Sequence, residues 1–139
     1  PAIKINASAE LKEVGLEQLP SNLNEIAAQG RITLTASNGE EIEIKADNWS
    51  GFGKMFNKNV SYLLIDQSRI AATALMEQSD TYKISFYTDD NSKASVVIEC
   101  KKAMSQKMTA EELKSLNQNA DTSKQYTMYI GEVTKTLMR

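Results

Sequence analysis

The chain of 139 residues contains no histidine, one cysteine, two prolines and six glycines. Without histidine it has neither a Ser-His-Asp triad nor a Cys-His dyad, and no imidazole to ligate a metal or a haem. The one thiol, Cys100, can form neither an intrachain disulfide nor a cysteine-rich zinc site. From these absences we expect no catalytic residues, no metal site and no cofactor, and we predict that the chain is not an enzyme.

Long apolar runs are also missing. No stretch of about 18 apolar residues occurs, so the sequence predicts no membrane span and no membrane partner. The opening residues 1–5 lack the basic start and apolar stretch of a signal peptide. One cysteine and no leader favour a reducing environment, which predicts a cytoplasmic protein.

What the chain does have is an ordinary globular composition, with 41% hydrophobic and 24% charged residues. The net charge of −2 is divided unevenly: residues 1–100 carry 9 basic and 14 acidic side chains, and residues 101–139 carry 7 and 4. The second part therefore has a net charge of +3, which is far less positive charge than the dense basic patch of a duplex DNA-binding protein carries. Because no repeat, low-complexity tract or linker interrupts the sequence, we predict a single domain over 1–139.

The clearest local signal is a β-hairpin over residues 32–44. A two-residue turn at Asn38-Gly39 would place Leu34 opposite Glu43 and mix apolar and charged side chains on one face. A three-residue loop with Gly39 in the left-handed region pairs Leu34 with Ile42 instead. The pattern therefore favours the bulged hairpin.

The remaining apolar pattern predicts an α+β fold. Its antiparallel sheet has six or seven strands, made of the hairpin and a four-stranded meander, and two helical segments cover it. The second meander strand is assigned from its context, although its three alanines favour a helix. The expected meander strands are 60–65, 69–77, 81–88 and 93–101; a further strand is 125–130, and the helical segments are 8–29, in two pieces, and 109–118. The last of these begins with a capping box, Thr109 and Glu112.

Residues 47–59 stand out as an aromatic, glycine-bearing loop that holds the only tryptophan, two phenylalanines, two glycines and two lysines. Aromatic anchors carry much of the binding energy of protein interfaces. We therefore predict a non-catalytic binding domain that engages a protein partner through this loop. The residues expected to contact the partner are Trp49, Phe52, Lys54, Phe56 and Lys58.

Two other interpretations of the same loop remain open. The five side chains could bind single-stranded nucleic acid weakly, because aromatic rings stack on bases and lysines neutralise phosphates. The three aromatic rings could instead plug one open edge of the sheet, with the glycines allowing the chain to turn.

An enzyme remains possible through Pro1, because an unblocked N-terminal proline is a secondary amine that can act as a base. The segment Pro1-Ala2-Ile3-Lys4-Ile5 resembles the opening strand of the tautomerase superfamily. The resemblance covers these residues alone. It implies catalysis by the Pro1 amine, whereas the antiparallel meander expected here differs from the β-α-β unit of that superfamily.

Two further features concern structure and assembly. Cys100 alternates with Val96 and Ile98, which predicts an inert thiol on the buried face. An exposed edge strand, either 41–46 or 125–130, could pair two copies of the chain into a homo-oligomer.

Overall fold

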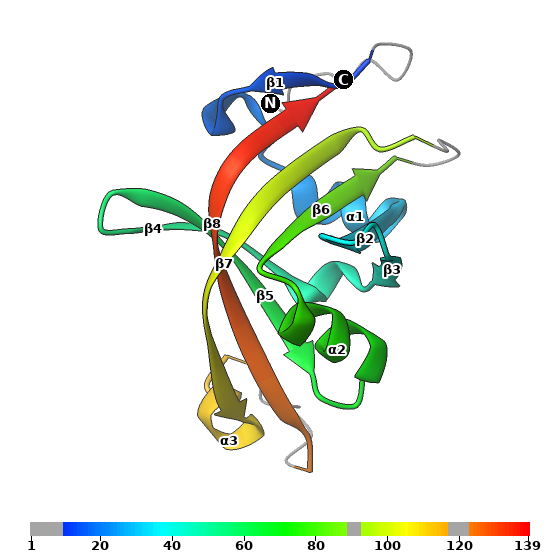
Figure 1. Ribbon diagram of the computed structural model, residues 1–139. Helices are drawn as coiled ribbons and strands as arrows, with labels where there is room; N and C mark the ends of the chain where they lie inside the picture. The colour runs from blue at the N-terminus through cyan, green and yellow to red at the C-terminus, as the bar shows by residue number, and fades with distance from the viewer. Residues whose placement is uncertain (1–9, 89–92, 117–122) are drawn as a thin grey trace.

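The computed structural model describes residues 10–88, 93–116 and 123–139, and it contains one antiparallel sheet of eight strands (Figure 1). The strands are β1 (Lys12–Val14), β2 (Arg31–Ala36), β3 (Glu41–Ile44), β4 (Trp49–Met55), β5 (Lys58–Asp66), β6 (Thr81–Tyr87), β7 (Val96–Thr109) and β8 (Gln125–Met138). The helices are α1 (Leu23–Gln29), α2 (Ile70–Gln78) and α3 (Ala110–Leu113), with single 3₁₀ turns η1 (Leu16–Gln18) and η2 (Ala46–Asn48). The predicted α+β class with an antiparallel sheet is confirmed.

The strand order is β3-β2-β6-β7-β8-β5-β4. The short strand β1 is not part of this order and pairs with the end of β8. The β2–β3 hairpin has the predicted register, with Leu34 opposite Ile42. Gly39 has a φ of 90°, the left-handed conformation that the three-residue loop requires. β3 lies at an edge of the sheet as expected, but residues 125–130 do not, because β8 is paired with β7 on one side and β5 on the other.

The sheet curls so that its concave face encloses the core. Trp49 on β4, at one end of the strand order, packs edge-on against Phe86 on β6, with ring centroids 5.1 Å apart. These two strands are far apart in the sheet, so the contact requires the sheet to bend back on itself. Fully buried side chains from β2, β6 and β7 complete this core; they include Ile32, Leu34, Ile84, Phe86, Val96 and Ile98.

The prediction of a strand at 69–77 is wrong, since this segment forms the helix α2. Its alanines have the highest helix propensity, and here the local preference prevails over the meander context. Ala72, Leu75 and Met76 are buried, and α2 packs against β2, β3 and β5. The connection from β5 to β6 therefore covers one opening of the curled sheet, as Figure 1 shows.

The predicted helical segments are partly confirmed. In 8–29 the second piece is α1, which ends at Gly30, but part of the first piece forms the strand β1 on β8. In 109–118 the capping box is present, with the Glu112 amide donating to the Thr109 hydroxyl at 3.1 Å, yet α3 spans only Ala110–Leu113. Residues 117 and 118 lie outside the described residues.

Candidate functional site

The segment 47–59 is not a loop but the end of η2, the β4–β5 hairpin and its turn. A β-bulge at Gly51, which has a φ of 92°, lies between Trp49 and Phe52. At the tip, Phe56 and Asn57 have φ values of 50° and 65°, which is typical of a two-residue hairpin turn. The glycines and aromatics that suggested a binding loop therefore belong to a twisted hairpin.

The five predicted partner-binding residues do not form one surface. Trp49 is buried, with 4% of its surface exposed, and Phe52 is half-buried against it at a ring-centroid distance of 5.2 Å. Phe56 is 97% exposed at the hairpin tip, and the two lysines are exposed on the strands beside it. The alternative of an aromatic plug therefore applies to Trp49 and, in part, to Phe52, but not to Phe56.

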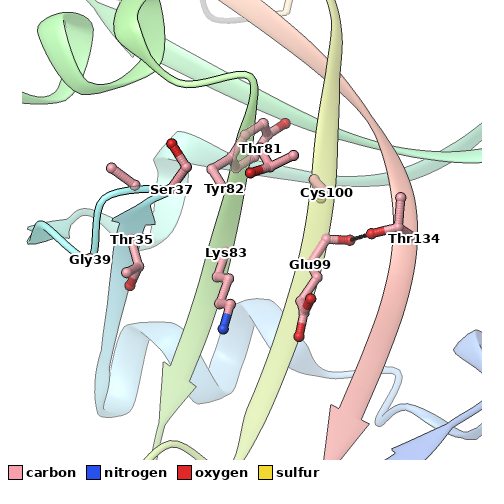
Figure 2. Close-up of a pocket in the computed structure, with 10 residues that line it drawn as sticks. Thr35, Ser37, Gly39, Thr81, Tyr82, Lys83, Glu99, Cys100 and Thr134 are labelled. Atoms are coloured by element: carbon pink, nitrogen blue, oxygen red, sulfur yellow. Dashed lines mark hydrogen bonds between the residues drawn. The ribbon is translucent and has the colours of Figure 1, made fainter.

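A different feature gathers polar side chains: a surface groove of about 340 Å³ across β2, β6, β7 and β8 (Figure 2). We call it the outer groove. Its volume lies at the lower end of the range of about 300–1,000 Å³ typical of small-molecule sites. Its lining residues are Thr35, Ala36, Ser37, Gly39, Thr81, Tyr82, Lys83, Glu99, Cys100 and Thr134.

The sheet register explains why the polar residues of the outer groove converge. Thr35 is the cross-strand partner of Lys83, and Lys83 is the partner of Glu99. Alternate residues of a strand point to the same face, so all three side chains project outward from adjacent strands. Figure 2 shows them in a row, pointing the same way. An ammonium and a carboxylate therefore stand side by side next to a hydroxyl.

Further hydroxyls surround this row. Ser37 and Thr81 line one end of the groove, and Thr134 on β8 lines its far side. The Thr134 hydroxyl donates to the backbone carbonyl of Glu99 at 3.1 Å, which ties β8 to β7 at this point. Hydroxyl groups both donate and accept hydrogen bonds, and an ammonium donates to anionic oxygens. The donor set suits a small polar ligand that carries a negative charge.

Tyr82 and Cys100 lie under the outer groove, each 2% exposed. Burial raises the pKa of Tyr82, and Cys100 raises it further. Burial likewise raises the pKa of the Cys100 thiol to about 12. Gly131 makes room for the tyrosine, because a Cβ at that position would lie 2.1 Å from the Tyr82 hydroxyl. The floor of the groove is thus a close-packed layer with no reactive thiolate near neutral pH.

We expect Cys100 to resist thiol reagents in the folded protein. Because its pKa is raised from 9.0 to about 12, the thiolate fraction of Cys100 near neutral pH is about a thousandfold lower than that of an ordinary thiol. Burial also keeps the reagent away from the sulfur. A colorimetric thiol reagent should therefore react slowly with the native chain and rapidly after denaturation with guanidinium. Equal rates in the two states would contradict the buried position.

Sequence reasoning missed the outer groove. It predicted strands at Thr35, Lys83 and Glu99, but the predicted strand 125–130 ends before Thr134 on β8. A usable signal was present: Lys83 and Glu99 are opposite charges on two consecutive strands of the predicted meander. In the described ranges 10–88, 93–116 and 123–139, no cluster of three or more Cys, Asp or Glu side chains is arranged to hold a metal ion. No helix within those ranges has the length and hydropathy of a bilayer span.

No protein-family model and no curated protein sequence matches this chain. Solved structures do match its fold. A candidate pyridoxamine 5′-phosphate oxidase from Lactobacillus delbrueckii has a TM-score of 0.51 at 8% identity, covering 90% of this chain and 98% of its own. The 2-nitrobenzoate 2-nitroreductase of Pseudomonas fluorescens has a TM-score of 0.50 at 13% identity, covering 92% and 77%. The flavin reductase of a Pseudomonas putida styrene monooxygenase has 0.47 at 11%, covering 78% of each chain.

These neighbours correct two predictions. The chain was expected to be a non-catalytic protein-binding domain and not an enzyme, and both expectations are contradicted, because two solved structures that share its fold are named as a candidate oxidase and a nitroreductase. The prediction of a binding domain depended on an exposed loop at 47–59. This segment is instead part of a hairpin, and its Trp49 is buried. The alternative of single-stranded nucleic-acid binding relied on the same five residues, of which Lys54, Phe56 and Lys58 are exposed, and it stays a prediction. Pro1, the basis of the remaining alternative, lies outside the described residues.

Proposed function

We propose that this chain is an oxidoreductase that binds a planar ring compound with an anionic group in the outer groove. The observation that carries the proposal is the Lys83 ammonium beside the Glu99 carboxylate, with the hydroxyls of Thr35, Ser37 and Thr81 around them. The two fold neighbours with TM-scores of 0.50 and 0.51 support the reaction class. Their names refer to pyridoxamine 5′-phosphate and 2-nitrobenzoate, which are both single rings carrying an anionic group.

The thiol of Cys100 does not suit the electron transfer that an oxidoreductase carries out. Cys100 is buried and its pKa is raised to about 12, so it is a thiol and not a thiolate under ordinary conditions. In oxidoreductases of this kind a bound organic cofactor carries the electrons, and the protein supplies binding and orientation. Flavin mononucleotide is the probe we choose, since it combines a planar ring, a hydroxyl-rich chain and a phosphate.

The donor set of the outer groove fits such a cofactor. Lys83 would hold the phosphate with a charge-assisted hydrogen bond, and the Thr and Ser hydroxyls would bond to the remaining polar atoms. Glu99 would accept a hydrogen bond from a ring N–H, while its charge keeps the phosphate on the Lys83 side. The ring would lie on backbone and small side chains, because Tyr82, the one aromatic lining residue, is buried. A bound flavin would supply hydride and single-electron transfer.

Titration of flavin mononucleotide with the purified chain tests the proposal. We expect a saturable, one-to-one change in flavin fluorescence, because binding in the groove changes the surroundings of the ring. Pyridoxal 5′-phosphate, followed by its absorbance, serves as a second probe with a smaller ring. If neither compound binds, the assignment of this groove to a ring-bearing anion is wrong.

A further inference from the structure

A second cavity, of about 410 Å³, lies at the other end of β2 from the outer groove. It is formed where the end of α1, the β2–β3 pair and the start of α2 meet, on the side of the molecule where Figure 1 shows these elements together. Three basic residues line it: Arg31, Lys45 and Arg69. Apart from Glu43 and Ile44, its other lining residues are alanine or glycine. We call it the cation pocket.

The charge of the cation pocket is opposite to that of the chain. Three cations and the one carboxylate of Glu43 leave a net charge of +2 in the lining, whereas the whole chain carries −2. Within the described residues, the ion pairs are Lys58 with Glu132 and Lys124 with Asp66, so none of the three pocket cations is neutralised by a salt bridge. A concave site with uncompensated positive charge attracts anions.

Contacts of their own side chains hold two of the three cations, Arg31 and Arg69, in place, and the backbone of the third, Lys45, is anchored. The Arg31 guanidinium stacks on the ring of Tyr87, 3.9 Å from its centroid. The Arg69 Nη2 atom donates to the backbone carbonyl of Glu43 at 2.9 Å. The backbone amide of Lys45 donates to the Asn48 side chain at 2.9 Å, which fixes the point from which the lysine extends. This order lowers the entropy lost when an anion is bound.

We propose that the cation pocket is a second ligand site, which binds the phosphate group of a small phosphorylated molecule. Planar guanidinium groups bind phosphate oxygens through paired N–H donors, and the lysine adds a point charge. A water molecule occupies about 30 Å³ in the liquid, and a phosphate group is only a few times larger. The cavity of about 410 Å³ is therefore far larger than a phosphate alone. The remaining space, lined by alanines, accommodates a compact organic group. The site is separate from the outer groove, so its ligand is additional to the ring compound proposed there.

Calorimetric titration of glycerol 3-phosphate and of inorganic phosphate into the full chain tests this site. Glycerol 3-phosphate carries a phosphate but no ring, so it lacks the planar group expected of the outer-groove ligand. We expect one binding site for glycerol 3-phosphate, weaker binding of inorganic phosphate, and an affinity that falls as salt is added. Lys45→Gln and Arg69→Gln should each weaken glycerol 3-phosphate binding about tenfold or more. Lys45 is exposed, so its variant is expected to fold even if Arg69→Gln, at the start of α2, does not.

Lys58→Gln is the matched control, because it removes the same charge from an exposed strand position away from the pocket. It should leave glycerol 3-phosphate binding unchanged. Lys83→Gln, in the outer groove, should also leave binding of this ring-free phosphate unchanged while impairing flavin binding, which separates failure of this proposal from failure of the proposed function. Absence of saturable glycerol 3-phosphate binding, or equal weakening by Lys45→Gln and Lys58→Gln, would overturn the proposal.

Discussion

Replacing Trp49 with alanine is expected to lower the free energy of unfolding by about 3–5 kcal/mol, the range for buried Trp or Phe truncations. Trp49 is 4% exposed; it contacts Phe52 on its own strand, β4, and it joins β4 at one end of the strand order to β6 through its contact with Phe86. Its indole N–H also donates to the Ser61 hydroxyl at 2.9 Å, and Ser61 is fully buried. The substitution therefore creates a cavity and removes a hydrogen-bond partner of Ser61. Urea unfolding measures the loss.

Phe56→Ala provides the matched comparison within the same hairpin. Phe56 is 97% exposed, so its truncation should change stability by no more than about 0.5 kcal/mol. The only tryptophan offers a second readout, since emission from a buried indole is blue-shifted and poorly quenched by iodide. Similar stability losses in the two variants, or red-shifted emission that iodide quenches, would show that Trp49 is not the anchor of the core.

Replacing Lys83 with glutamine is expected to weaken flavin mononucleotide binding about ten- to hundredfold. A hydrogen bond to a charged group contributes about 1.5–3 kcal/mol, and each 1.4 kcal/mol changes Kd about tenfold. Lys83 is exposed on β6 beside Glu99, so the substitution leaves the core intact. Flavin fluorescence titrations of the variant and the parent protein give the two dissociation constants.

Lys58→Gln controls for the change in net charge, and it should bind flavin mononucleotide as the parent does. Lys58 lies on β5 and pairs with Glu132, away from the lining of the outer groove. If both variants weakened binding to the same extent, the effect of Lys83 would be a general electrostatic one and the assigned phosphate contact would be wrong.

The sequence predicts well those elements in which local and long-range preferences agree. In the β2–β3 hairpin, the glycine position, the side-chain parity and the turn geometry all require the same register, and Leu34 is opposite Ile42 as expected. In α2 they disagreed: alanine favoured a helix and the neighbouring strands suggested a meander. The helix formed because it can bury Ala72, Leu75 and Met76 over an opening of the sheet, which no local pattern reveals.

The site was harder to predict than the fold. Two errors were made, on Trp49 and on the pair Lys83 and Glu99, and both depend on which face of a strand other parts of the chain cover. Trp49 was assigned to a surface since its neighbours include glycines and lysines, and only the curl of the sheet brings Phe86 against it. Lys83 and Glu99 were unremarkable as outward-facing residues, and only the register places them side by side in a groove. A search of neighbouring predicted strands for charges of opposite sign on the same face would have found them.

The most direct test of the outer groove is an amide ¹H–¹⁵N NMR titration of the chain with flavin mononucleotide. We expect the largest shift changes on residues 35–39, 81–83, 99–100 and 134, and we expect Lys83→Gln to suppress them. No change in the spectrum, or changes centred on the β4–β5 hairpin at residues 49–66, would contradict the assignment of this groove as the cofactor site.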